Sequence, residues 1–279
     1  MRYTISDCYQ YGKSKLAGCN LNPTDADFLL PIALGIDKKS IYPNMLITPK
    51  KYKKFCKLIR LRCKRMSMDK LIGYTEFMDN IIPFSPHTLT PRQETEILVD
   101  MIISDNKSRY NLKVLDLCTG SGCIGIAVAK RLHADVTMSD ISKRAIKNAK
   151  HNARINNAKV DIVYSNMFDN IHSTFDIIIS NPPYIPTKDV DALEHEVKYY
   201  DPTLALDGGE DGLDFYRIIA DKAPQFLNPK GKIYLEIGID EGDSLIEILS
   251  TNFTNISVIK DYAGIDRFII AKKVNKDVK

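Results

Sequence analysis

The sequence contains no tryptophan and only five histidines. Its six cysteines form no C-x-x-C pair and have no histidine at ligand spacing, so neither a zinc site nor a disulfide framework is indicated. No apolar run approaches the ~18 residues of a membrane-spanning helix, and the first ten residues lack the apolar stretch of a secretory signal. We therefore expect a cytoplasmic protein with reduced thiols, without a metal and without a membrane segment.

What is present is typical of a folded globular protein. Hydrophobic residues make up 44% of the 279 residues, charged residues make up 27%, and the mean hydropathy is −0.20. These values argue against a disordered or fibrous chain. The length fits a large domain together with a small one.

Charge is distributed unevenly along the chain. Residues 1–80 carry 15 Lys and Arg against 7 Asp and Glu, whereas the remainder carries 24 against 28. Helical apolar spacing predicts a helix over 25–35, interrupted or kinked at Pro31, and a strongly basic one over 50–70. The basic face is either a solvated helix surface or a docking surface for an acidic or nucleic-acid-bearing partner. We expect a helical domain at 1–70 and a linker or hairpin at 71–89.

From residue 90 onward the pattern changes to short apolar strands alternating with amphipathic helices. Thr90 is predicted to cap the first helix, with Pro91 at its first position and Gln93 completing a capping box. Strands are expected at 113–117, 135–139, 160–164, 175–180, 232–237, 256–260 and 266–272. This alternation predicts an α/β domain over 90–279, with a Rossmann-like, mainly parallel sheet and helices on both faces.

A glycine-rich loop follows the first of these strands and predicts a nucleoside site. Glycines there let the chain turn sharply into a helix and let a ligand approach the backbone, while Asp140 ends the next strand, where a carboxylate can bind a ribose diol. The letters also fit a dinucleotide fingerprint, so a nicotinamide-dependent oxidoreductase is a rival interpretation. An acid at 116 favours a cationic, sulfonium-bearing cofactor over a pyrophosphate. The predicted cofactor-binding residues of this loop are Asp116, Cys118, Thr119, Gly120, Ser121 and Gly122.

A second motif, Asn181-Pro182-Pro183-Tyr184, directly follows the predicted strand at 175–180. The prolines lack N–H groups and hold the backbone extended, so the segment presents carbonyl groups without competing donors. The Asn181 side-chain oxygen and the Pro182 carbonyl can each accept a hydrogen from a planar –NH2 group while the Tyr184 ring stacks on it. We predict Asn181, Pro182 and Tyr184 as catalytic residues, and the four residues together as substrate-binding.

These motifs resemble those of S-adenosylmethionine-dependent methyltransferases that modify planar amino groups. Five further stretches resemble, more specifically, those of the release factor glutamine methyltransferases, the HemK/PrmC family. They are residues 91–96, 73–77, 201–202, 212–217 and 235–238, and they follow a basic helical module as in that family. The sequence departs from the family at Cys118, where glycine is frequent, and at Asn166-Met167, where an acid and an aromatic residue are frequent.

The resemblance implies the reaction and the partner. It implies methyl transfer from S-adenosyl-L-methionine to the glutamine amide nitrogen in the Gly-Gly-Gln motif of class 1 peptide chain release factors. Asn166, Met167 and Asn181 are then further cofactor contacts, with Asn166 able to accept from the adenine amine and Met167 able to cover its ring. No direct nucleic-acid substrate is expected. The alternatives are a nucleic-acid amino-methyltransferase, which would also explain the basic module, and a non-catalytic adaptor that binds release factor.

Overall fold

The computed structural model describes residues 3–83 and 85–274. The chain divides into two compact units, residues 1–74 and 75–279. Each has its own apolar core. No helix among the described residues is both long enough and apolar enough to cross a membrane.

The first unit is a small helical bundle around one core. Its helices are α1 (Ile5–Ala17), α2 (Asp25–Leu34), α3 (Pro49–Cys63) and α4 (Met68–Ile72), with a short 3-10 turn η1 (Lys38–Ser40) and a two-stranded sheet of β1 (Tyr3–Thr4) and β2 (Leu46–Ile47). The predicted helix at 25–35 is confirmed and ends before Gly35, whose φ is 65°, but the expected interruption at Pro31 is wrong, since the helix is continuous across that residue.

The single basic helix expected over 50–70 is wrong, because that stretch contains two helices. α3 is capped by the Thr48 hydroxyl and ends at Cys63, after which Arg65 adopts a left-handed φ of 64°. The Ser67 side chain then caps α4. Phe55 and Ile59 of α3 are buried in the core, as the apolar spacing predicted. The serine cap was the signal of the break, since serine favours helix starts over helix interiors.

The second unit contains a seven-stranded sheet in the order β10-β11-β9-β8-β5-β6-β7. Neighbours from β9 through β7 are parallel, and β11 runs antiparallel between β9 and β10. This confirms the mainly parallel Rossmann-like sheet predicted from the sequence. The strands are β5 (Leu112–Leu117), β6 (Ala134–Asp140), β7 (Asp161–Tyr164), β8 (Phe175–Ser180), β9 (Leu227–Glu236), β10 (Phe253–Lys260) and β11 (Asp266–Lys273).

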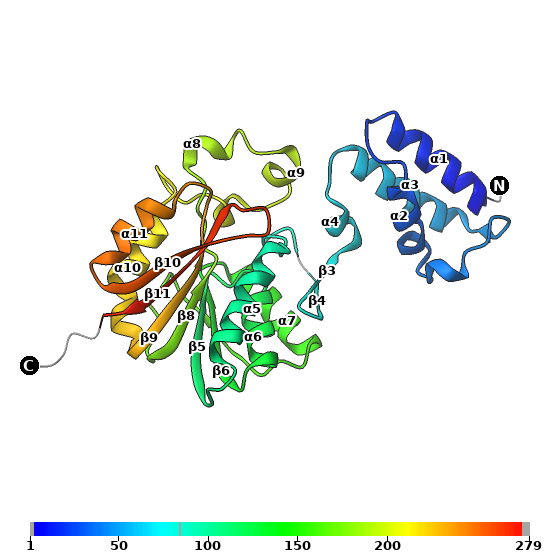
Figure 1. Ribbon diagram of the computed structural model, residues 1–279. Helices are drawn as coiled ribbons and strands as arrows, with labels where there is room; N and C mark the ends of the chain where they lie inside the picture. Colours follow the sequence, from blue (N-terminus) through cyan, green and yellow to red (C-terminus); the bar gives the residue numbers. More distant parts are fainter. Residues whose placement is uncertain (1–2, 84, 275–279) are drawn as a thin grey trace, which may run out of the picture. The chain divides into compact units, whose positions relative to one another are not determined.

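Helices cover both faces of this sheet (Figure 1). α5 (Glu94–Asn106), α6 (Cys123–Arg131) and α7 (Lys143–Ile155) bury apolar side chains on one face, and α10 (Asp214–Phe226) and α11 (Gly242–Ser250) do so on the other. The strand order reverses beside β5: β6 and β7 follow on one side, β8 and β9 on the other. Ligands of open α/β sheets bind at such a switch point, outside the carboxyl ends of the strands.

A hairpin of β3 (Tyr74–Phe77) and β4 (Asn80–Pro83) lies at the start of this unit, within the stretch predicted as linker or hairpin. Its turn residues Met78 and Asp79 have φ values of 48° and 62°, as a type I′ turn requires. Phe77 and Ile82 are buried in the core of this unit, where β4 packs against α6 and α7. The hairpin therefore belongs to the core of the second unit.

The helix start predicted at Thr90 is wrong. α5 begins at Glu94, and Gln93 occupies its cap position without a side-chain hydrogen bond. The Thr90 hydroxyl instead donates to Asp201 Oδ1 at 3.4 Å, and the Arg92 guanidinium contacts Asp201 Oδ2 at 3.2 Å. A long-range contact with a buried carboxylate thus replaces the local cap. Asp201 belongs to a segment after β8 that also holds α8 (Thr187–Val190), α9 (His195–Lys198) and the 3-10 turn η2 (Thr203–Ala205), none of which was predicted.

Candidate functional site

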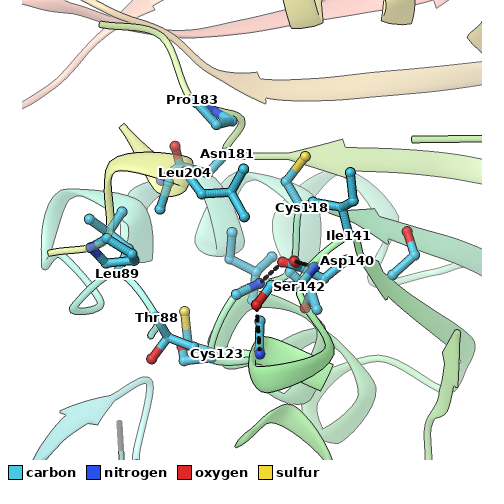
Figure 2. A pocket seen from close by; sticks show the side chains of 18 of the residues that line it. Thr88, Leu89, Cys118, Cys123, Asp140, Ile141, Ser142, Asn181, Pro183 and Leu204 are labelled. Carbon is cyan, nitrogen blue, oxygen red and sulfur yellow. Dashed lines mark hydrogen bonds between the residues drawn. The ribbon is translucent and has the colours of Figure 1, made fainter. Parts of the chain in front are cut away.

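A cavity of about 210 Å³ opens at the carboxyl ends of β5, β6 and β8. Figure 2 shows Asn181 and Pro183 entering it from the side opposite Ser142 and Cys123. Nine of the predicted site residues line this cavity: Cys118, Thr119, Gly120, Ser121, Asp140, Asn166, Met167, Asn181 and Pro183. The strand ends therefore bring together side chains that are up to 65 positions apart in the sequence.

Asp140 connects the two loops at one side of the cavity. Its Oδ2 accepts from the backbone N–H of Gly120 at 2.9 Å, and its Oδ1 accepts from the N–H of Ser142 at 2.7 Å (Figure 2). Burial raises the pKa of Asp140, while these N–H donors act in the opposite direction. Each carboxylate oxygen has a second lone pair, so the group can hold the loops and still accept from hydroxyl groups of a ligand.

Asp116 lies beneath the glycine loop. Its side chain is fully buried, and Oδ2 accepts from the Thr119 hydroxyl at 2.6 Å and from the Gly125 N–H at 3.0 Å. Burial raises the pKa of this carboxyl to about 7. Gly120 and Gly122 have φ values of 56° and 84°, which allow the turn from β5 into α6. Asp116 therefore orders the loop from below.

The two departures from the family pattern meet at the cavity wall. Cys118 Sγ lies 3.8 Å from Met167 Sδ, and both residues adopt left-handed backbone conformations with φ of 57° and 45°. The Ser165 hydroxyl donates to the Met167 carbonyl at 2.8 Å and fixes its turn. Asn166, between them, is exposed and lines the cavity. Two sulfur atoms thus occupy a place where the family commonly has a glycine and an aromatic ring.

The segment after β8 is held by a neighbouring loop that approaches its backbone closely. The Ile185 N–H donates to the Leu206 carbonyl at 2.9 Å, and the Gly208 N–H donates to the Ile185 carbonyl at 2.8 Å. A Cβ added at Gly208 would lie 2.8 Å from Tyr184 Cα and 2.9 Å from the Pro183 carbonyl oxygen. Glycine is required here by close backbone approach, which keeps Asn181 to Tyr184 in a fixed conformation.

Four predicted site residues do not contribute to the cavity lining: Asp116, Gly122, Pro182 and Tyr184. Tyr184 instead packs against the core beneath α10, and burial raises the pKa of its phenol to about 12. The prediction missed further lining residues from several segments. Of these, only Pro91, Arg92, Thr95, Pro202 and Phe215 carried a signal, because they lie in the family-motif stretches 91–96, 201–202 and 212–217. The missed residues include His87, Thr88, Leu89, Thr90, Ile141, Ser142, Pro202, Leu204, Ala205 and Phe215.

The cavity fits S-adenosylmethionine by the chemistry of its walls. A Cβ added at Gly120 would have no neighbour closer than 3.9 Å, so the backbone there is open to a ligand. Asp140 supplies a carboxylate for a ribose diol, and Ile141 and Met167 supply apolar surface for an adenine ring. Asn166 supplies an amide oxygen that can accept from an exocyclic amine.

Comparison with known proteins gives concordant results. Residues 91–197 match the family model of the methyltransferase small domain. The chain is 38% identical over 250 residues to the release factor glutamine methyltransferase of Geobacter sulfurreducens, covering 88% of this chain and 87% of that protein. It is 33% identical to the Chlamydia trachomatis serovar D enzyme of the same name, covering 99% and 96%.

Among solved structures, a methyltransferase from Pyrococcus furiosus has a TM-score of 0.52 at 22% identity, covering 69% of this chain and 88% of that one. This likeness supports the fold, whereas the curated relatives span nearly the whole chain. The resemblance stated from the motifs is thereby confirmed. The chain belongs to the release factor glutamine methyltransferase family, with S-adenosylmethionine as its methyl donor.

Proposed function

We propose that this chain methylates the side-chain amide nitrogen of the glutamine in the Gly-Gly-Gln motif of class 1 peptide chain release factors. The observation that carries the proposal is the convergence of Asn181 with the Asp140 loop on one cavity. Membership of the family supports the same substrate. When bound, S-adenosylmethionine supplies an electrophilic methyl group.

The residues after β8 are proposed to prepare the nitrogen for reaction. An amide nitrogen is a poor nucleophile because its lone pair is delocalised into the carbonyl. Asn181 Oδ1 and the Pro182 carbonyl oxygen each accept one N–H bond of the –NH2 group, which raises electron density on the nitrogen and fixes its direction of attack. The Tyr184 ring packs against the core and supports the backbone of this segment. The new N–C bond would form as the methyl–sulfur bond of the sulfonium breaks, which leaves a neutral thioether, and the nitrogen would then lose one N–H proton to water.

The cofactor-binding roles are proposed as follows. Asp140 accepts hydrogen bonds from the ribose hydroxyls. Gly120 and its neighbours in the loop have no bulky side chain in the way, so the ligand can approach the backbone. Asp116 orders that loop. Asn166 and Met167 contact the adenine.

We further propose that residues 1–70 dock the release factor. A single glutamine offers too little surface for specificity, and a second contact raises the effective concentration of the substrate. The exposed lysines and arginines of α3 favour an acidic surface on that partner. We also propose a cytoplasmic location, which the free cysteines and a substrate that acts in translation support.

The proposal is tested with two release factors that differ only at the Gly-Gly-Gln glutamine. The purified chain is incubated with labelled S-adenosylmethionine and either the wild-type factor or one whose glutamine is replaced by alanine. Label is expected only on the wild-type factor. Equal labelling of both would contradict the proposed target, and label on added transfer or ribosomal RNA would favour the nucleic-acid alternative.

A further inference from the structure

A buried carboxyl group that the proposed reaction does not use lies directly behind Asn181. Glu236 is the last residue of β9, and Asn181 follows the last residue of β8. The two strands are parallel neighbours in which Ser180 pairs with Leu235, so the next pair along the sheet edge is Asn181 and Glu236. The fold therefore places this acid beside the amide that we assign to the target nitrogen.

The contacts of Glu236 fix its carboxylate in this place. Its side chain is 2% exposed, and its Oε2 accepts from the Thr95 hydroxyl in the first turn of α5 at 2.6 Å. The Asn181 side chain lies near enough to interact with the same carboxylate and to lower its pKa. The Tyr216 hydroxyl donates to the Glu236 carbonyl at 2.8 Å and holds the end of the strand. A nearly fully buried acid and its backbone are thus held by groups from α5, α10 and the segment after β8.

An ionised carboxylate can only accept, so it selects which end of the Asn181 amide faces it. The NH2 end turns to Glu236, and the Oδ1 end is left for the cavity. The negative charge also polarises the amide, which makes Oδ1 a stronger acceptor for a further N–H bond, because linked hydrogen bonds strengthen one another at low dielectric. The target –NH2 group needs an acceptor that faces the cavity and that accepts strongly, and Glu236 favours both properties in Asn181.

We infer that Glu236, in its ionised form and anchored by Thr95, is a positioning residue that orients and polarises Asn181 for methyl transfer. This inference rests on the proposed function. Protonation of Glu236 adds an O–H donor to a group that could previously only accept, and so weakens the preference for the productive amide orientation. The rate constant is therefore expected to fall as the pH is lowered through the titration of this group.

The electrostatic surroundings put that titration in an accessible range. Burial raises the pKa of Glu236 to about 7, opposed by hydrogen bonds from Thr95 and Asn181 and by the Arg267 guanidinium on β11. Glu94 on α5 raises it further, and the Tyr184 phenol is a titratable neighbour after β8. Glu241 offers a matched control, because burial also raises its pKa to about 7 while its carboxylate accepts from the Gly238 N–H at 2.7 Å.

The first experiment measures kcat at saturating cofactor and release factor from pH 5.5 to 9. For the wild-type chain kcat is expected to fall about tenfold from its plateau by one pH unit below the midpoint near 7. Glu236→Gln should lose this acid limb and about ten- to a hundredfold of the plateau, with an unchanged KM for the release factor. Glu241→Gln should keep the limb. A limb that persists in Glu236→Gln, or that disappears in Glu241→Gln, overturns the inference.

The second experiment does not depend on turnover. The side-chain amide resonance of Asn181, identified by its loss in Asn181→Ala, is followed by NMR over the same pH range. It should shift with a midpoint near 7 in the wild-type chain and in Glu241→Gln, and should not shift in Glu236→Gln. An Asn181 resonance that is independent of pH in all three proteins refutes the role of Glu236. Failure of the wild-type chain to methylate release factor, with the amide titration intact, would refute only the proposed function.

Discussion

Replacing Asp140 should weaken cofactor binding by about the free energy of the hydrogen bonds that its carboxylate makes with the ligand. Asp140→Ala removes the proposed acceptor for the ribose hydroxyls and leaves the N–H groups of Gly120 and Ser142 without their partner. Hydrogen bonds to charged groups contribute about 1.5–3 kcal/mol, so the dissociation constant for S-adenosylmethionine should rise about 10- to 150-fold. Asp140→Asn retains one acceptor oxygen and should fall near the lower end of this range.

Calorimetric titration with S-adenosylmethionine measures this effect, and Asp135→Ala is the matched control. Asp135 is an exposed residue near the opposite end of the same strand, β6, and its replacement should leave the dissociation constant unchanged. Since burial raises the pKa of Asp140, affinity should also decrease on acidification at a higher pH than for an ordinary aspartate, and Asp140→Asn should lack this decrease. Equal affinity of the wild-type chain and Asp140→Ala would remove Asp140 from the ribose site.

Three further predictions concern the loop after β8 and the first unit. Asn181→Ala should lower kcat at least about 10²- to 10³-fold with cofactor affinity retained. Tyr184→Phe should lower kcat only slightly, and Tyr184→Ala should lower it strongly. Radiolabel transfer measures these rates, and full activity of Asn181→Ala would refute the amide contact. Gly208→Ala should cost about 1–3 kcal/mol of stability in denaturant unfolding because its Cβ meets backbone atoms, and Gly18→Ala should not. Residues 75–279 alone should bind cofactor but lose most activity on intact release factor, and full turnover would reduce the first unit to a stabilising element.

Much of the α/β unit could be predicted because its strands are buried and short. A short apolar run such as 175–180 is buried on both sides only as an inner strand of a sheet covered by helices, so its pattern predicts such a strand. The glycine-rich loop was predictable because Gly120 and Gly122 adopt positive φ values that other residues rarely adopt. Asn181 could be identified because two prolines directly after a predicted strand mark the edge of the sheet, where ligands bind. Each of these patterns involves residues close together in the sequence, so it can be recognised without the structure.

The rest depends on contacts between distant residues. The cap predicted at Thr90 failed because Asp201, 111 positions away, accepts from the same hydroxyl. A three-residue turn such as η2 has too few residues to show a period, so the cavity wall that contains Leu204 was not predicted. Glu236 lies in the family-motif stretch 235–238, but the pairing of β8 with β9 was needed to place it behind Asn181.

Localising the transferred methyl group tests the central claim most directly. Purified release factors and total transfer and ribosomal RNA are incubated together with the wild-type chain and labelled S-adenosylmethionine, and every product is digested and sequenced by mass spectrometry. One methyl group is expected on the side-chain nitrogen of the Gly-Gly-Gln glutamine, with none on RNA. A methyl group on an adenine or guanine amine, or on another release-factor residue, would contradict the account.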